Sequence, residues 1–128
     1  MDLVYSLPSC RLYAMPTRAT IDKGRVMTNY VVSIGRNAGS AVLDDIAWLT
    51  FRDDVKRVIK ENDGRLHSIA LGDGEYDGLV EETAVFVFEI ADNGPTYRLE
   101  KTLGHIAYKF GQECIAWQEV KTVRFIAP

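Results

Sequence analysis

The chain has 128 residues, the usual size of a single domain that can bury a core without disulfides or metals. Apolar residues make up 47% of the chain and charged residues 26%, as in an ordinary globular protein, and the formal net charge is −3. This acidic balance argues against direct nucleic acid binding through a basic face, and no stretch approaches the roughly 20 apolar residues of a membrane span.

The first 26 residues show no clear hydrophobic period, and Pro8, Pro16 and Gly24 interrupt them. We expect residues 1–26 to be an N-terminal extension, with a hairpin added at one edge of a sheet, and residues 27–128 to be one domain. The start of the chain has neither a basic segment nor a continuous apolar run, so a cytoplasmic location is expected, in the host cell if a phage encodes the protein. The two cysteines, Cys10 and Cys114, are far apart and are interpreted as small buried hydrophobic residues.

Residues 27–34 are β-branched and aromatic and end at Gly35, which predicts a strand. After a turn at 36–39, Ser40 is expected to open a helix, with Asp44 and Asp45 in its early turns. Apolar residues then recur at helical spacing up to a stop signal at residues 62–64.

Residues 66–71 predict a second strand, followed by a Gly-rich loop at 72–78. Residues 82–90 form the clearest strand of the chain, and because both of its faces are apolar we expect it to lie in the centre of the sheet. The loop resembles the first half of an EF-hand loop, but Ala84 stands where that loop needs a bidentate Glu, so a hairpin turn is the better interpretation.

A turn at 92–95 leads into a second helix, with Pro95 in its first turn and Gly111 as the residue just after its end. The residues that give this helix its period are Leu99, Leu103, Ile106, Ala107 and Phe110. A strand is expected over 113–126, and its length of about 14 residues exceeds the usual 5–6, so we expect it to bend or to pair across a subunit boundary.

The predicted order is β-α-β-β-α-β, which is typical of the α+β ferredoxin-like sandwich. In that fold a four-stranded antiparallel sheet carries both helices on one face. The other face then requires solvent, the N-terminal extension or a partner as its cover. We therefore expect a homo-oligomer, a dimer or larger.

The string from Tyr108 to Trp117, with Phe110-Gly111-Gln112-Glu113 as its specific motif, resembles a family of small bacterial and phage domains of unassigned function. Their second helix ends in Tyr, a basic residue and then Phe-Gly-Gln-Glu before an apolar strand. The resemblance spans roughly residues 28–120 and implies the same ferredoxin-like fold. It implies no particular activity.

Several polar residues are candidates for a ligand site. An anion pocket for a nucleotide phosphate is one hypothesis, and solvated surface charges are the more ordinary explanation. Gln112 and Glu113 are either an amide and carboxylate for a ligand or caps for the helix end, and capping is favoured. The proposed ligand-binding residues are Arg36, Asn37, Arg65, Tyr76, Arg98, Gln112 and Glu113.

Chemistry beyond binding has little support in the residue pattern. His67 and His105 stand alone on separate elements, and Cys114 has no third group beside His105 for thiol catalysis, so no metal or other cofactor is expected. The aromatic residues lack the basic signature of an RNA-binding sheet, and core or interface burial is favoured for them; they are Trp48, Phe86, Phe88, Tyr97 and Trp117.

These observations favour a small, non-enzymatic binding protein of phage or mobile-element type. It would occupy a host protein or sequester a small nucleotide-like ligand, and counter-defence is one such role. The alternative is a small hydrolase or isomerase that uses Glu113 with Gln112 and His105. A purely structural assembly protein is a third hypothesis.

Overall fold

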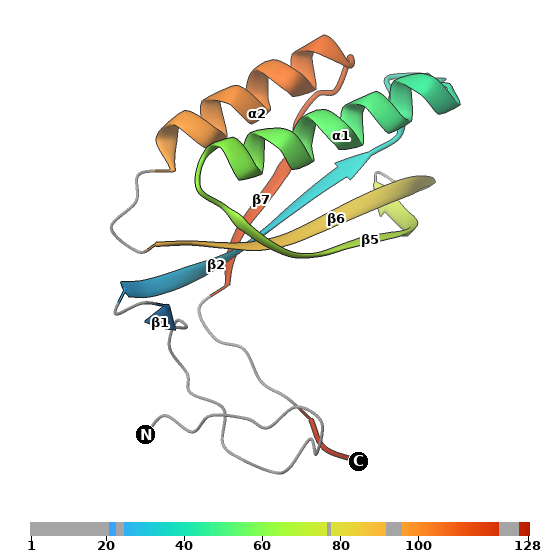
Figure 1. Ribbon diagram of the computed structural model, residues 1–128. Helices are drawn as coiled ribbons and strands as arrows, with labels where there is room; N and C mark the ends of the chain where they lie inside the picture. Colours follow the sequence, from blue (N-terminus) through green and yellow to red (C-terminus); the bar gives the residue numbers. More distant parts are fainter. Residues whose placement is uncertain (1–20, 23–24, 77, 92–95, 121–125) are drawn as a thin grey trace.

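The computed structural model describes residues 21–22, 25–76, 78–91, 96–120 and 126–128. Two helices, α1 (Asp45–Glu61) and α2 (Tyr97–Lys109), lie side by side across one face of an antiparallel sheet (Figure 1). The four main strands are β2 (Arg25–Gly35), β5 (Arg65–Tyr76), β6 (Leu79–Ala91) and β7 (Ala116–Val120).

The spatial order of these strands is β7-β2-β6-β5. Strands β2 and β6 form the centre and pair from Met27 with Ala91 to Gly35 with Thr83. Strand β7 lies on the outer side of β2, and β5 lies on the outer side of β6. With two helices on one face, this order confirms the predicted ferredoxin-like architecture.

A short strand, β1 (Ile21–Asp22), pairs with Arg25 and Val26 at the start of β2. This pairing lies within the predicted N-terminal extension, and β2 begins two residues before the predicted Met27. Residues 1–20, with Cys10, lie outside the described residues.

The first helix begins at Asp45, so the prediction that Ser40 opens it is wrong. Residues 37–42 form a small hairpin of β3 (Asn37–Ala38) and β4 (Ala41–Val42), closed by a hydrogen bond from Leu43 N to Arg36 O at 3.0 Å. Asp44 is the N-cap, because its Oδ1 accepts the Ala47 backbone N–H at 2.8 Å.

The predicted stop signal does end α1. Asp63 takes a left-handed φ of 62°, and Gly64 N donates to Ile59 O at 2.9 Å. A Cβ on Gly64 would lie 2.6 Å from Ile59 Cγ2, so this close approach requires glycine. The chain enters β5 directly after this turn, which makes α1 and β5 antiparallel neighbours.

The loop expected at 72–78 is mostly strand, because residues 72–76 continue β5 and pair with residues 79–83 of β6. Gly78 has a positive φ of 77° in the tight turn that joins the two strands. The resemblance to an EF-hand loop therefore has no structural counterpart, since these residues form a long hairpin.

The second helix ends as predicted, with Gly111 at a φ of 69°. Gln112 N donates to Ala107 O at 2.9 Å and Gly111 N to Tyr108 O at 3.1 Å, the two bonds of a Schellman motif. Strand β7 begins at Ala116 and not at Glu113. Residues 92–95, with Pro95, and residues 121–125 of the expected long strand lie outside the described residues.

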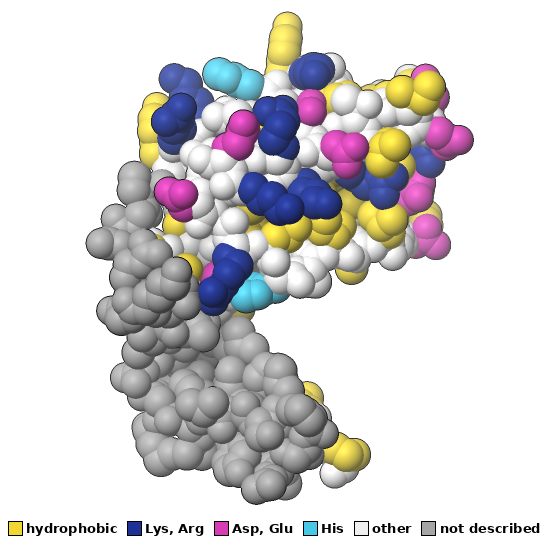
Figure 2. Space-filling model, in the orientation of Figure 1, with side chains coloured by type: hydrophobic (Ala, Val, Ile, Leu, Met, Phe, Trp, Pro, Cys, Tyr) yellow, Lys and Arg dark blue, Asp and Glu magenta, His cyan; other side chains and the backbone are white. Residues whose placement is uncertain are grey.

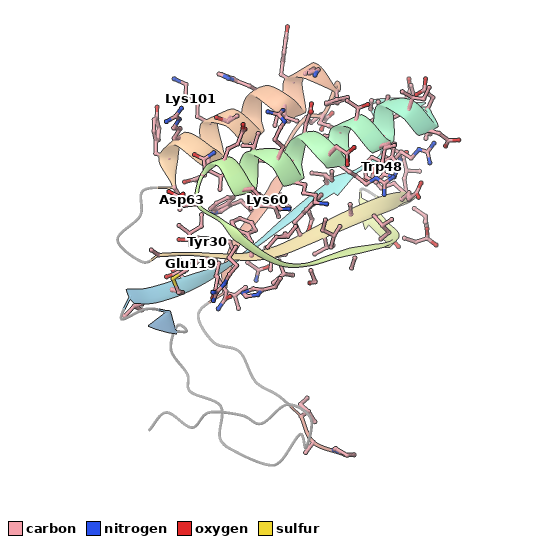
Figure 3. The ribbon with its side chains drawn as sticks, viewed as in Figure 1. Tyr30, Trp48, Lys60, Asp63, Lys101 and Glu119 are labelled. Carbon is pink, nitrogen blue, oxygen red and sulfur yellow. The ribbon has the colours of Figure 1, made fainter. Side chains whose placement is uncertain are left out.

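The core lies between the helices and the sheet, where Trp48 points from α1 toward the strands (Figure 3). Trp48 packs edge-on against Phe51 at 6.1 Å, and Trp117 against Phe88 at 6.0 Å. Core burial is thus confirmed for Trp48, Phe86 and Phe88, and Trp117 is partly buried. Tyr97 is exposed, contrary to the expectation of burial. Of the described helices, neither α1 nor α2 is long and apolar enough to span a membrane.

Candidate functional site

Arg36, the first residue after β2, lies at the centre of a cluster of polar contacts at this end of the sheet. Its Nη1 donates to Glu82 Oε2 at 2.6 Å, its Nη2 to Asp45 Oδ1 at 2.7 Å and its Nε to Leu43 O at 2.7 Å. The side chain is 19% exposed. These bonds join β2, β6 and the start of α1.

Asn37 and Gln112 belong to the same cluster. The Asn37 backbone N–H donates to Glu81 Oε2 at 2.9 Å, and its carbonyl oxygen accepts from Gln112 Nε2 at 2.9 Å. The Glu81 carboxylate lies directly over Gly35, where any Cβ would collide with it. The structure thus brings together three of the predicted site residues, Arg36, Asn37 and Gln112.

The electrostatics of this cluster favour internal pairing. Hydrogen bonds to Glu82 and then to Asp45 raise the pKa of the Arg36 guanidinium above its ordinary value. The carboxylates of Glu82 and Asp45 together outweigh the single positive charge of this guanidinium. An anion would therefore meet a surplus of negative charge there, and the geometry is that of a structural brace.

The other predicted ligand-binding residues lie elsewhere. Arg65 is level with Asn29 on β2, and at about 3.3 Å per residue the seven residues from 29 to 36 separate it from Arg36 by roughly 23 Å. Arg98 is exposed in the first turn of α2, and Glu113 is exposed after the helix end. Tyr76 ends β5, and its side chain lies outside what is described.

The residues of the enzymatic alternative do not form a cleft in the described structure. His105 is exposed on α2, Cys114 is exposed beyond it, and the Gln112 amide is already bonded to Asn37 O. Two surface hollows are lined by residues of α1 and β5, and neither includes Glu113, Gln112 or His105. Within the described ranges, His, Cys, Asp and Glu side chains form no group of three that could hold a metal ion.

The sequence pattern did not lead us to a second polar cluster, which is centred on Glu89 of β6. The Glu89 side chain is only 1% exposed, on the face of the sheet away from the helices. It accepts a hydrogen bond from Arg65 Nη2, and its Oε2 lies 3.5 Å from His67 Nε2 without a hydrogen bond. The available signal was an acidic residue that interrupts the second apolar face of a central strand, Val85-x-Val87-x-Glu89.

A groove of about 570 Å³ runs between the C-terminal half of α1 and the first half of β5. We call it the α1–β5 groove. Figure 2 shows Lys and Arg side chains gathered over α1 with hydrophobic side chains exposed beside them, and Figure 3 shows Lys60 where α1 passes over β5. The groove is lined by Lys56, Lys60, Gly64, Arg65, Leu66, His67, Ser68 and Ile69.

The groove has a basic lining with no acidic side chain. Arg65 and His67 contact Glu89, whereas Lys56 and Lys60 form no ion pair within the described part of the chain. Strand β5 is also an edge strand, since it pairs with β6 and with no other described strand. The groove therefore combines positive charge with an open row of backbone donors and acceptors.

Comparisons with known proteins establish the fold. No family model and no curated protein matches the chain. The C-terminal domain of the MgtC protein from Mycobacterium tuberculosis matches with a TM-score of 0.56 and 18% identity, over 80% of this chain and 95% of that one. The 30S ribosomal protein S6 from Thermotoga maritima matches with a TM-score of 0.52 and 14% identity, over 73% and 85%.

A phage SAM lyase in its apo state matches with a TM-score of 0.41 and 17% identity, over 76% of this chain and 83% of that one. At these identities the similarity to the MgtC domain and to S6 is a similarity of backbone fold. The TM-score of the lyase is lower, and we infer nothing about activity from it. The chain is thus similar to small domains with two helices on an antiparallel sheet, and it has the ferredoxin-like fold.

Proposed function

We propose that the chain is a non-enzymatic binding protein that holds an extended polypeptide segment along the edge of β5. The observation that carries this proposal is an open edge strand of 12 residues with apolar side chains exposed at its centre. Ile69 and Leu71 both point to the helix side of the sheet, and Leu71 is 54% exposed. Native edge strands of this length and composition are usually covered, because they otherwise pair with other chains.

The neighbouring side of α1 extends this apolar surface. Lys56 and Lys60 line the groove with β5, and Leu49 precedes Lys56 by seven residues, which places it on the same face of the helix. Leu49 is 51% exposed. A bound strand would cover this side chain together with Ile69 and Leu71.

The charge of the groove indicates the chemistry of the bound segment. Its basic lining favours a segment whose acidic side chains reach Lys56 and Lys60 while apolar side chains cover Ile69 and Leu71. Backbone hydrogen bonds to an edge strand supply affinity, and pockets for alternate side chains supply specificity. The expected occupant is an extended segment with alternating acidic and apolar residues.

The resemblance to small phage and bacterial domains supports a biological role for such binding. A phage or mobile element could use this protein in counter-defence, as an inhibitor that occupies a strand of a host protein. A small nucleotide-like ligand is the competing occupant of the groove, because its phosphate would meet the same two lysines. Arg65 and His67 are already engaged by Glu89, which leaves fewer cationic groups for a phosphate than for a longer acidic segment.

The test is the binding of a fluorescent peptide in which Asp and Ile alternate, with a Lys and Ile peptide as its control. We expect the acidic peptide to bind and the basic peptide to bind much more weakly. Leu71→Glu should abolish binding, because a carboxylate would lie in the apolar centre of the edge. Tyr108→Glu, at an exposed position on α2, should leave binding unchanged and is the matched control.

Adding nucleoside phosphates as competitors separates the two occupants. Nucleotide binding without peptide binding would overturn the proposal in favour of a small ligand. Conversion of the nucleotide into a product would support the enzymatic alternative.

A further inference from the structure

The edge of strand β5 is complementary to itself in charge and hydrophobicity. Its first half is basic, with Arg65 and His67, and its second half is acidic, with Asp73 and Glu75, while Ile69 and Leu71 lie between them. Resting on the function proposed above, we propose that the segment bound along β5 is β5 of a second copy of this chain.

A two-fold axis through Ala70 fits this pattern. Antiparallel strands related by this axis place residues at equal distances from Ala70 opposite each other, so Ile69 faces Leu71 of the second copy. Such directly opposite apolar pairs are the unit that stabilises a sheet. The apolar centre of each edge is then covered by the apolar centre of the other.

The charged ends also match in this register. Asp73 and Glu75 pair with Glu82 and Val80 of β6 and so lie on the helix side of the sheet, at the end of the edge that meets Lys56 and Lys60 of the second copy. A bulge between Leu66 and Ser68 shifts the pairing near the start of β5. The bulge also leaves Arg65, the partner of Glu89, on the face away from the helices, so the attraction between opposite ends comes from Lys56 and Lys60 facing Asp73 and Glu75.

Helix α1 repeats the same polarity in the second layer. It begins after the N-cap Asp44 with Asp45, and it carries Lys56 and Lys60 in its second half. Because α1 runs antiparallel to β5, its acidic start lies toward the acidic end of the strand and its basic half toward the basic start. The two-fold axis therefore sets the acidic part of each edge against the basic part of the other in both layers.

Joining the β5 edges makes one continuous sheet with all four helices on the same face. Helix α1 contacts both β5 and β6 and is the helix over this side of the sheet (Figure 1). Strands lie about 4.8 Å apart, so two copies of α1 centred over the β5–β6 pairs would lie about 10 Å apart, the usual distance of packed helices. Leu49 then becomes buried between the two copies of α1.

The oligomeric state of the full chain is the first test, measured by sedimentation velocity over a wide concentration range. We expect a reversible dimer, and Leu71→Glu should raise its dissociation constant by about 100-fold, because the new carboxylate would be buried without a partner. Tyr108→Glu is again the control, and far-ultraviolet circular dichroism checks that each variant is folded.

A charge exchange tests the contact between the ends. Glu75→Lys alone places a third cation near Lys56 and Lys60 of the second copy and should weaken the dimer. Lys60→Glu alone places a carboxylate near Asp73 and Glu75 of the second copy and should do the same. A mixture of the two variants restores opposite charges at both ends, so a heterodimer should form.

Cysteine cross-linking tests the axis directly, in a background with Cys10→Ser and Cys114→Ser. The axis places the two Ala70 Cβ atoms opposite each other, so Ala70→Cys should form a disulfide between chains on mild oxidation. Ser68→Cys faces Gly72 of the second copy and should not. A dimer whose dissociation constant is unchanged by Leu71→Glu and that does not cross-link at position 70 would overturn the inference.

The outcomes separate this inference from the function on which it rests. A chain that stays monomeric at every concentration and still binds the acidic peptide would overturn the second-copy occupant and keep the binding function. A monomer that binds no peptide would overturn both.

Discussion

Gln112 Nε2 donates a hydrogen bond of 2.9 Å to the carbonyl oxygen of Asn37, which joins two residues that are 75 positions apart in the chain. One follows the end of α2 and the other follows the end of β2. The same glutamine also caps its helix through the backbone, since its N–H donates to Ala107 O. Gln112 therefore holds the helix layer against the end of the sheet.

This contact predicts different consequences for the two polar residues of the Phe-Gly-Gln-Glu motif. Gln112→Ala should lower the free energy of unfolding by about 1 kcal/mol, because a part-buried hydrogen bond is lost while the backbone cap remains. Glu113→Ala, at an exposed position, should stay within about 0.5 kcal/mol of the parent chain. Urea denaturation measures both, and equal losses would contradict the structural role of Gln112.

The contacts of Arg36 predict how the stability of the fold depends on pH. Arg36→Met should destabilise the fold, because Glu82, Asp45 and Leu43 O lose their common donor. The folded-state pKa of Arg36 is raised, so its contribution is complete below the unfolded-state pKa and is lost only as the pH rises through the still higher folded-state pKa.

The difference in unfolding free energy between the parent chain and Arg36→Met should therefore be constant between about pH 7 and pH 9. Thermal and urea unfolding at both pH values measure this difference. A difference that falls across this range would show that another group is responsible. Arg36→Lys is the companion variant, and because it keeps the charge but loses the guanidinium fork it should be intermediate.

Much of the fold could be predicted from local patterns. The apolar period of α2 and its stop at Gly111 depend on neighbours along the chain, and both predictions were confirmed. The start of α1 could not be placed, because Ser40 and Asp44 are equally good caps in sequence. The choice was made by a tertiary contact, the hairpin closed between Leu43 and Arg36.

The candidate site was less predictable because it depends on register. Arg36 and Arg65 both follow or open strands, but only the pairing of β2, β6 and β5 shows that they lie at different ends of the sheet. The α1–β5 groove combines residues from a helix face and a strand edge. No local pattern reports that β5 is an edge strand, since its position follows from the order of all four strands.

Three glycines test the backbone geometry. Gly111→Ala should cost about 1–2 kcal/mol, because its φ of 69° is strained for any side chain. Gly64→Ala should also destabilise, because its Cβ would collide with Ile59. Gly104→Ala has open space inside α2 and should stabilise by about 0.5–1 kcal/mol. Chemical denaturation ranks the three variants, and a stabilising Gly111→Ala would contradict the helix end described.

The Glu89–Arg65 pair is asymmetric in burial, and this asymmetry predicts unequal costs of breaking it. Glu89 is 1% exposed, whereas the Arg65 side chain is 51% exposed. Arg65→Met leaves a buried carboxylate that has, among the described residues, only the His67 imidazole as a charged or ionisable neighbour, and it should cost about 3–5 kcal/mol. Glu89→Met leaves a guanidinium that water can reach, and it also removes the unbonded Oε2 from the interior. This substitution should therefore lower the free energy of unfolding by less than about 1 kcal/mol.

Urea unfolding at one low protein concentration measures the free energy of unfolding of both variants, since assembly would shift the apparent stability. Equal costs for the two variants would mean that Glu89 is not the buried, dependent partner of the pair.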